Sequence, residues 1–191
     1  MPLARTLLLL CGTLSLVRPA LSQAPVSPGG KPVIFGPTEG ERRWRGGGQV
    51  PFVIKVDRLN TGSPQLVFGT SDFSPGQRIP VHRHGQEDEI IFIHRGTATV
   101  TLGGRRTQIG SGSTVYIPRG TWVGIENAAQ DTLTMLFIFA TPGVEEYLRR
   151  SSAPEGQPFS SIPPAQMQEL CRTYHMELQN GLPGGVCGPR P

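Results

Sequence analysis

The sequence contains little of what a long membrane helix, a disulfide-rich scaffold or a nucleic-acid-binding surface requires. Of its 191 residues, 37% are hydrophobic, 7% are aromatic and three are cysteines. The apolar stretch at residues 7–17 is shorter than the roughly 20 residues that cross a bilayer as a helix. The net charge of +4 is too small to indicate nucleic acid or a membrane surface as a partner. Glycine and proline are abundant, with 25 and 19 residues, so turns are expected to be frequent and long helices few.

Residues 1–22 have the features of a secretory signal peptide. Arg5 supplies a positive charge before the short apolar stretch, and small residues, Ala20 and Ser22, occupy the positions that signal peptidase reads. Cleavage is expected after Ser22, with cleavage after Ala24 as the alternative; an uncleaved membrane anchor is less favoured because the apolar stretch is short. The sequence therefore predicts a periplasmic or secreted protein with no membrane span after cleavage. Its net charge would then be +2, which again does not favour nucleic acid.

The cysteines agree with export. Cys11 would leave with the signal peptide, and Cys171 and Cys187 would remain. Two cysteines in an oxidising compartment favour one disulfide, which would join the C-terminal tail to the helix expected before it. The alternative is a zinc site that includes His175, but four ligands are not available nearby in the sequence.

Short apolar and β-branched runs predict a single all-β domain at residues 48–141. Glycine, proline and asparagine turn signals separate the runs, an arrangement typical of a sandwich or barrel. The expected strands cover residues 52–56, 65–68, 89–94, 97–102, 114–117, 122–126 and 132–140.

The segments on either side of this domain have a different character. Residues 23–47 are rich in proline, glycine and charge and are expected to form an extended arm, in which residues 41–45 would be a solvated basic loop. Residues 142–191 are expected to form a C-terminal extension with short helices. One helix is predicted at residues 144–150 and a second at 163–178, where apolar side chains recur at the spacing of one helix face.

The residues with the clearest chemistry are His82, His84 and Glu89. Successive side chains of a strand point to opposite faces, so His82 and His84 face the same way. Glu89 begins the next apolar run and can return to the same pocket. Two imidazoles and a carboxylate that leave coordination positions open are the ligands of non-haem iron oxygenases. The sequence therefore predicts a site for one divalent transition metal ion, which could be Fe, Mn, Ni, Zn or Cu.

The spacing of these residues resembles the first signature of the cupin family, G-x5-H-x-H-x4-E-x6-G, which here runs from Gly76 to Gly96. The second signature, G-x5-P-x-G-x2-H-x3-N, is matched by Gly112, Pro118, Gly120 and Asn127, with Val123 at the position of its histidine. The tail from residue 141 is similar to that of bacterial single-domain cupins often likened to quercetin dioxygenases. The resemblance implies a jelly-roll barrel (a double-stranded β-helix) that holds a metal, binds a small molecule and forms a homodimer.

The valine at position 123 leaves two interpretations of the metal site. Cupin sites typically use three histidines and a glutamate, and this chain offers only His82, His84 and Glu89. In one interpretation these three ligands form an open, working site; in the other, metal affinity has been lost and the barrel only binds a ligand. In the second case Glu89 would pair with Arg78 or Arg83, and the histidines would hydrogen-bond each other and water. We favour the working site, because a buried and unpaired carboxylate would be costly.

Alternation along the strands also outlines a substrate pocket. Ile91 shares the face of Glu89, Val123 faces the same interior, and Tyr116 could line the mouth, although a residue of this kind is more often ordinary core. The interior is therefore expected to be mostly apolar. These features predict an exported metal-binding cupin, a dioxygenase-type oxidoreductase that acts on a small organic substrate. A non-catalytic ligand-binding module and an oxygen-independent isomerase or lyase are the alternatives.

Overall fold

A computed structural model of the protein describes residues 29–45 and 49–189. The expected signal peptide, with Cys11, and the first part of the expected arm lie outside the described residues. In the part that is described, no helix combines the length and the hydrophobicity needed to cross a membrane.

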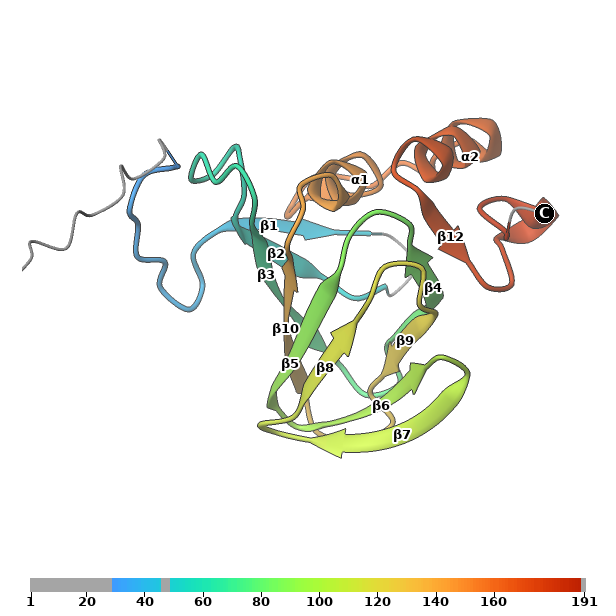
Figure 1. Ribbon diagram of the computed structural model, residues 1–191, viewed down its shortest axis with the longest axis horizontal. Helices are drawn as coiled ribbons and strands as arrows, with labels where there is room; N and C mark the ends of the chain where they lie inside the picture. The colour runs from blue at the N-terminus through green and yellow to red at the C-terminus, as the bar shows by residue number, and fades with distance from the viewer. Residues whose placement is uncertain (1–28, 46–48, 190–191) are drawn as a thin grey trace, which may run out of the picture.

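Two antiparallel sheets form the molecule, as expected for a jelly-roll barrel, and they face each other across the interior (Figure 1). The larger sheet has, in spatial order, the seven strands β11 (Ala153–Pro154), β1 (Glu41–Trp44), β2 (Phe52–Val56), β3 (Val67–Phe73), β10 (Leu133–Phe139), β5 (Glu89–Arg95) and β8 (Thr114–Ile117). The smaller sheet has the five strands β12 (Met176–Leu178), β4 (Arg78–His84), β9 (Val123–Glu126), β6 (Thr97–Leu102) and β7 (Arg105–Gly110).

The hydrophobic core lies between the inner faces of the two sheets. Along β10, buried and half-buried side chains alternate strictly, so that Leu133, Met135, Phe137 and Phe139 all point inward. This is the period of two that a strand with one buried face requires. The alternation that is visible in the sequence therefore sets which side chains reach the interior.

The glycines of the two sequence motifs are turn residues. Gly76, Gly96, Gly112 and Gly120 all have φ between 78° and 85°, a conformation that other residues rarely adopt. Asn127 is fully buried, and its side-chain amide donates to the backbone oxygens of Phe73 and Asp131. The motif asparagine thus holds a turn of the barrel together and is not a ligand.

The barrel uses more of the chain than residues 48–141. Residues 41–44, expected in a solvated loop, form β1, which pairs with β2 on one side and β11 on the other. The loop prediction was wrong because the side chains at positions 41, 43 and 45 alternate inward and those at 42 and 44 outward. Basic residues concealed this strand pattern, since arginine side chains can be half-buried when they find partners.

The C-terminal extension begins with α1 (Val144–Arg150), as predicted, and continues with α2 (Pro164–Thr173) and the short 3₁₀ helix η1 (Pro183–Gly185). Both α1 and α2 lie over one end of the sheets (Figure 1). The second helix ends at Thr173, and not at residue 178 as predicted, because His175 has a positive φ of 50° and turns the chain back. Met176–Leu178 then pairs with β4 as strand β12.

A disulfide joins Cys171 of α2 to Cys187 behind η1. Both cysteines are buried, together with Met176, in a small apolar cluster of their own. The Leu178 amide donates to the Cys187 carbonyl at 2.7 Å, and the Gln179 amide donates to Val81 of β4 at 2.9 Å. The disulfide therefore closes a loop that carries β12 against the edge of the smaller sheet.

Helix α1 is attached to the first strands by a buried ion cluster. Arg149 binds Glu41 of β1 at 2.6 Å and also bonds to the fully buried Asp57, which follows β2. Arg43 of β1 binds Glu41 and donates to the carbonyl of Arg149. These bonds set the position of α1, and with it the position of Ser151 at the C-terminal end of the helix.

Candidate metal centre

The three predicted ligands come together at the end of the barrel that the C-terminal extension covers. His82 and His84 lie on β4 of the smaller sheet, and Glu89 begins β5 of the larger sheet. The loop between the two strands crosses from one sheet to the other at this end. One potential ligand atom from each residue lies within 4.8 Å of the others. Among the residues that the structure describes, this is the one group of histidine, cysteine and acidic side chains with that property.

Neighbouring groups orient both imidazoles. His82 Nδ1 lies 2.8 Å from the carbonyl oxygen of Pro80. With the proton on Nδ1, His82 donates to this carbonyl and its Nε2 lone pair is directed away from it. The His84 ring packs edge-on against Phe139, with 4.9 Å between ring centroids, and lies 5.0 Å from the His82 ring at an interplanar angle of 83°.

The buried polar atoms of the cluster are not satisfied by other protein groups. Within the described part of the chain, His84 Nδ1 and Glu89 Oε2 have no hydrogen-bond partner. His84 Nε2 lies 3.7 Å from Glu89 Oε2, a distance that is too long for a hydrogen bond. Buried carboxylates and imidazoles are ordinarily paired or bound to a metal. This geometry fits a divalent cation between the three side chains.

The electrostatic state of these groups follows from burial. Without a cation, burial raises the pKa of Glu89 to about 8. Burial also lowers the pKa of His84 well below its usual value, and the neighbouring His82 adds to that shift. The pKa of His82 is lowered by burial, opposed by its hydrogen bond to Pro80 and lowered further by the charge of Arg45. Both histidines are therefore neutral at pH 7, the form that coordinates metals.

The arginine pairings that would have explained Glu89 without a metal are not formed. Arg83 binds Glu177 of β12 at 2.6 Å and stacks over the ring of Trp122, 4.6 Å from its centroid. Arg78 makes no ion pair with Glu89 in the described structure, and its side chain is exposed. Trp122 thus contacts Arg83 and not the three predicted ligands.

A cavity of about 640 Å³ opens from the three ligands into the barrel. Val123 lies directly opposite His82 in the pairing of β4 with β9, is completely buried and lines this cavity. Ile91 also lines it, next to Glu89 on the inner face of β5. The apolar interior and the positions of Ile91 and Val123 are those that alternation predicted.

Tyr116 does not belong to the cavity. Its side chain is 58% exposed and points outward from β8, whereas its neighbours Val115 and Ile117 point inward. The prediction that it lines the mouth was wrong, as was the alternative that it is core, because the alternation of β8 places it on the outer face. His94, on the outward face of β5, is exposed as well.

The loop between β4 and β5 carries two acids close in sequence to the predicted ligands. Glu87 is buried and not solvated, and burial raises its pKa. It does not line the cavity; a side chain on Gly143 would come within 2.9 Å of its carboxylate. Asp88 accepts a hydrogen bond from the Arg119 guanidinium at 3.0 Å, at the surface. Neither acid faces the three predicted ligands, so neither is placed for acid–base chemistry there.

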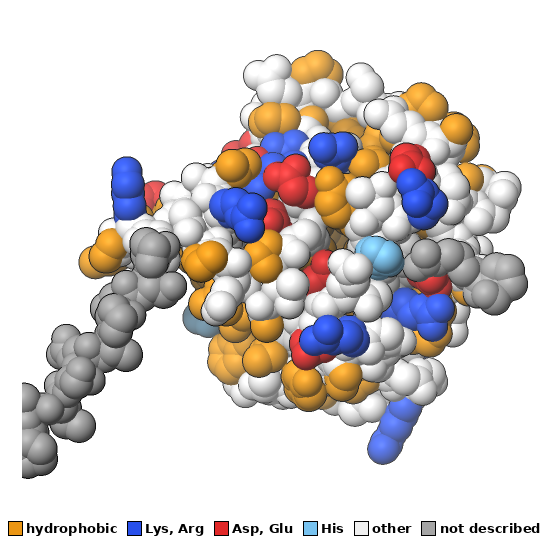
Figure 2. Space-filling view, turned by 45° about the horizontal axis from the view of Figure 1, so that its top comes forward, with side chains coloured by type: hydrophobic (Ala, Val, Ile, Leu, Met, Phe, Trp, Pro, Cys, Tyr) orange, Lys and Arg blue, Asp and Glu red, His pale blue; other side chains and the backbone are white. Residues whose placement is uncertain are grey.

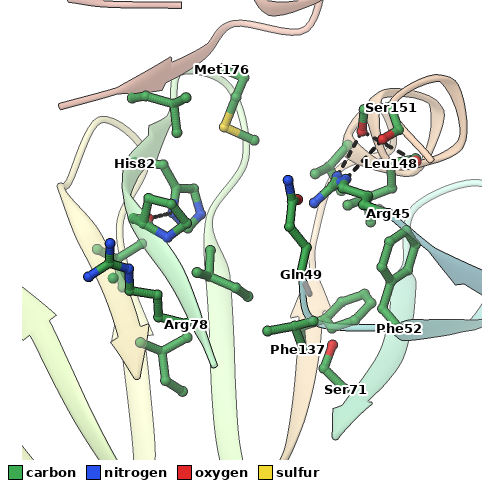
Figure 3. A pocket seen from close by; sticks show the side chains of 18 of the residues that line it. Arg45, Gln49, Phe52, Ser71, Arg78, His82, Phe137, Leu148, Ser151 and Met176 are labelled. Atoms are coloured by element: carbon green, nitrogen blue, oxygen red, sulfur yellow. Dashed lines mark hydrogen bonds between the residues drawn. The ribbon is translucent and has the colours of Figure 1, made fainter. Parts of the chain in front are cut away.

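Two parts of the cavity wall were not anticipated from the sequence. The first is Met176 and Leu178, which lie opposite His84 and His82 in the pairing of β12 with β4 and share their face. The second is Arg45, which faces His82 across the cavity together with Gln49 and Phe52 (Figure 3). The alternation at residues 41–45 is the one sequence signal that could have located Arg45. The pairing of β12 with β4 has no local signal.

The outer surface shows no single dominant charge on the side that faces the viewer in Figure 2. Lysine and arginine side chains are interspersed there with aspartate and glutamate and with apolar patches. Some of these opposite charges form salt bridges at the surface, such as those of Arg42 with Glu155 and of Arg106 with Glu126. Such a surface agrees with the small net charge.

Comparison with known proteins gives one family. The family model described as "Cupin domain" matches residues 69–139. A protein of Streptomyces coelicolor, the uncharacterized protein SCO3923, is 31% identical over 104 residues, which are 54% of this chain and 90% of that protein.

Two solved structures share the fold. One is an RmlC-like cupin from Shewanella frigidimarina, which is 15% identical, has a TM-score of 0.51 and is matched over 62% of this chain and 97% of its own. The other is a predicted oxalate decarboxylase from Thermotoga maritima, which is 19% identical, has a TM-score of 0.51 and is matched over 57% and 98%. These two structures show the fold, and the match to the cupin family model, together with the two glycine motifs, shows that the chain belongs to the cupin superfamily.

Proposed function

We propose that the chain is an exported, metal-dependent cupin that acts as a dioxygenase-type oxidoreductase on a small organic substrate. The observation that supports it most is the convergence of His82, His84 and Glu89, with two buried polar atoms left without protein partners, at one end of an apolar cavity. When bound, a divalent ion of Fe, Mn, Ni, Zn or Cu would supply a Lewis-acidic centre with positions free for oxygen or substrate.

The chain's own residues would hold the ion and prepare the cavity. Pro80 fixes the orientation of His82 through its carbonyl oxygen, and Phe139 fixes the His84 ring by packing against its edge. Apolar side chains such as Ile91 and Val123 line the cavity, and a substrate packed against them would displace water, which would strengthen electrostatic interactions inside it. The volume of about 640 Å³ is in the range of sites for small organic molecules.

The first test is metal stoichiometry. The mature chain, refolded separately with each of the five metals, should bind one ion per chain as measured by mass spectrometry. His82→Ala should abolish this binding, and His94→Ala should leave it intact because His94 is an exposed histidine on the outer face of β5. Failure of all five metals to bind stoichiometrically would refute the proposal.

The second test is catalysis. Oxygen uptake is followed with flavonol-like and enediol compounds, using the metal-loaded protein and the His82→Ala variant. Uptake that requires both metal and His82 supports a dioxygenase. Turnover that persists without oxygen would indicate an isomerase or lyase that uses the same site.

A second candidate function is non-catalytic binding of a small ligand, and Val123 is the observation that favours it. A valine where cupins carry a ligand removes one of four metal contacts, although the cavity itself is intact. This function predicts that ligands raise the thermal midpoint without turnover, and that His82→Ala hardly changes their affinity.

We also propose that the protein functions as a homodimer in the periplasm or outside the cell. The disulfide between Cys171 and Cys187 supports an oxidising compartment. Ile90 and Tyr116, paired across β5 and β8, expose apolar surface on the outer face of the larger sheet, which supports a partner there. Cell fractionation and light scattering of the mature chain test these two statements separately.

A further inference from the structure

Arg45 is the feature of the cavity that metal binding leaves unexplained. It follows β1, lines the cavity, and faces His82 from the opposite wall (Figure 3). Arginine is seldom buried without a carboxylate, because its charge is costly to remove from water. A half-buried guanidinium on the wall of this cavity can therefore be neutralised by an anionic group of a bound ligand.

The structure describes no acidic partner for Arg45. Its Nε and Nη2 donate to the carbonyl and the hydroxyl of Ser151, both uncharged, at 3.0 and 2.7 Å. Two acids in and after the first strands are already engaged with other arginines: Glu41 binds Arg43 and Arg149, and Asp57 bonds to Arg149. In the described chain no carboxylate therefore neutralises the charge of Arg45, and burial lowers the pKa of its guanidinium.

The guanidinium of Arg45 is held in a defined plane. Its Cζ lies 5.4 Å from the ring centroid of Phe52 and 5.8 Å from that of Tyr147. The two hydrogen bonds to Ser151 fix the orientation of the guanidinium within that plane. Arginine has five N–H donors, so donors remain on Nη1 and Nη2 for a further partner.

From this arrangement we infer that the substrate or ligand of the cavity is a small organic carboxylate, whose carboxylate group binds Arg45 while its apolar body extends toward His82, His84 and Glu89. The inference rests on the proposed function in taking the cavity as the substrate site. A carboxylate matches the planar fork of a guanidinium, with two parallel N–H···O bonds.

The same wall disfavours a phosphorylated ligand. A phosphate group carries nearly two negative charges and needs several donors around it. Near Arg45 the wall is formed by Phe52 and Leu148, with Gln49 and Ser151 as uncharged polar neighbours (Figure 3). Arg78 lines the cavity from the other wall, but its charge is exposed to water, so that an ion pair there would contribute little.

The test uses 3-phenylpropanoate and its uncharged analogue 3-phenylpropanamide. Binding to the full mature chain is measured by calorimetry after chelation of metals, so that the carboxylate cannot be held by a metal ion. We expect the carboxylate to bind at least about tenfold more tightly than the amide, since hydrogen bonds to a charged group are stronger than those to a neutral one. Equal affinities, or no binding of the carboxylate, would overturn the inference.

Four variants locate the preference. Arg45→Gln should abolish it, and Arg45→Lys should retain part of it, because the charge stays and the fork is lost. Ser151→Ala removes one acceptor of Arg45 without changing any charge and should preserve it, as should Arg78→Gln. If Arg78→Gln and not Arg45→Gln removed the preference, the assignment to Arg45 would be wrong.

Failure of this inference and failure of the proposed function give different results. A carboxylate preference that persists in His82→Ala and depends on Arg45 supports the anion site even if no metal binds. Stoichiometric metal binding without any carboxylate preference would leave the metal site standing and remove the anion site.

Discussion

Val123 lies directly opposite His82 in the antiparallel pair of β4 and β9, and both side chains face the cavity. The residue at the position of the second-motif histidine is therefore placed where a fourth ligand could reach the same centre. The chain lacks that ligand because of one side chain, since β9 is formed and Val123 pairs with His82, although the pairing of β4 with β9 shifts register between Ile79 and His82.

Val123→His should consequently increase metal affinity. Changing an outer partner of a metal ligand already alters affinity by about 10- to 100-fold, so an added ligand is expected to raise it by at least about tenfold. Competition with a chelator measures the change. Ile125→His is the control, because Ile125 faces the same cavity two residues farther along β9, opposite Ile79. An equal gain in both variants would mean that any added histidine suffices.

Glu89 should make the stability of the metal-free protein depend on pH. Its carboxyl titrates near pH 4.5 in the unfolded chain, whereas burial raises the folded-state pKa to about 8. The folded state keeps a proton that the unfolded state has released, so stability falls as pH rises from about 4.5 to about 8. Glu89→Gln lacks this term, and its advantage in thermal midpoint over the unaltered chain should grow across that interval.

The experiment is a series of thermal melts in chelator between about pH 5 and pH 9. Buried His84, whose pKa is lowered, destabilises the fold toward acid pH, but it is present in both proteins and cancels in the comparison. A difference in midpoint that stays constant over the whole interval would contradict the burial of an unpaired Glu89.

The disulfide should stabilise the cap formed by α2, β12 and η1. Replacing Cys171 and Cys187 together by serine opens a loop with a sequence separation of 16 residues. A loop of this length is expected to cost about 3 kcal/mol of unfolding free energy, measured by urea denaturation. In hydrogen exchange the Gln179 amide, which donates to Val81 of β4, should lose protection, and amides of β6 should retain theirs. Equal loss of protection at Gln179 and in β6 would indicate that the cap does not open separately from the barrel.

Arg149 should be the most sensitive polar residue outside the cavity. Arg149→Met leaves the fully buried Asp57 without its cation and Glu41 with Arg43 alone, which is expected to cost about 3–5 kcal/mol. The neighbouring Arg150 has an exposed side chain and lies 4.0 Å from Glu146, so Arg150→Met should change stability by less than about 0.5 kcal/mol. Urea denaturation of both variants decides between a structural and a dispensable cluster.

Much of the barrel could be predicted because its signals are local. The alternation of apolar residues predicted strands such as residues 97–102 and 114–117 at their observed bounds. The first helix was also predicted at its observed bounds, residues 144–150. The same alternation placed His82 and His84 on one face of a strand, and the spacing to Glu89 brought the carboxylate back to them.

What could not be predicted depends on pairing between distant segments. No local feature of Met176–Leu178 indicates that it leaves the helical pattern to pair with β4, since the alternative partner is visible only in the folded barrel. Arg45 was misjudged for a related reason: a basic residue before three glycines is typical of a solvated loop, and its burial becomes evident only when β1 is seen between β2 and β11. Tyr116 was wrongly predicted because its residue type was weighed above the alternation of β8, which places it on the outer face.

His82 and His84 belong to one sheet and Glu89 belongs to the other, so an ion held by all three would crosslink the two layers of the sandwich at the end that the C-terminal extension covers. Cation binding would then stabilise the whole domain. Occupancy could be followed by calorimetric melting in a crude preparation, before any substrate is known.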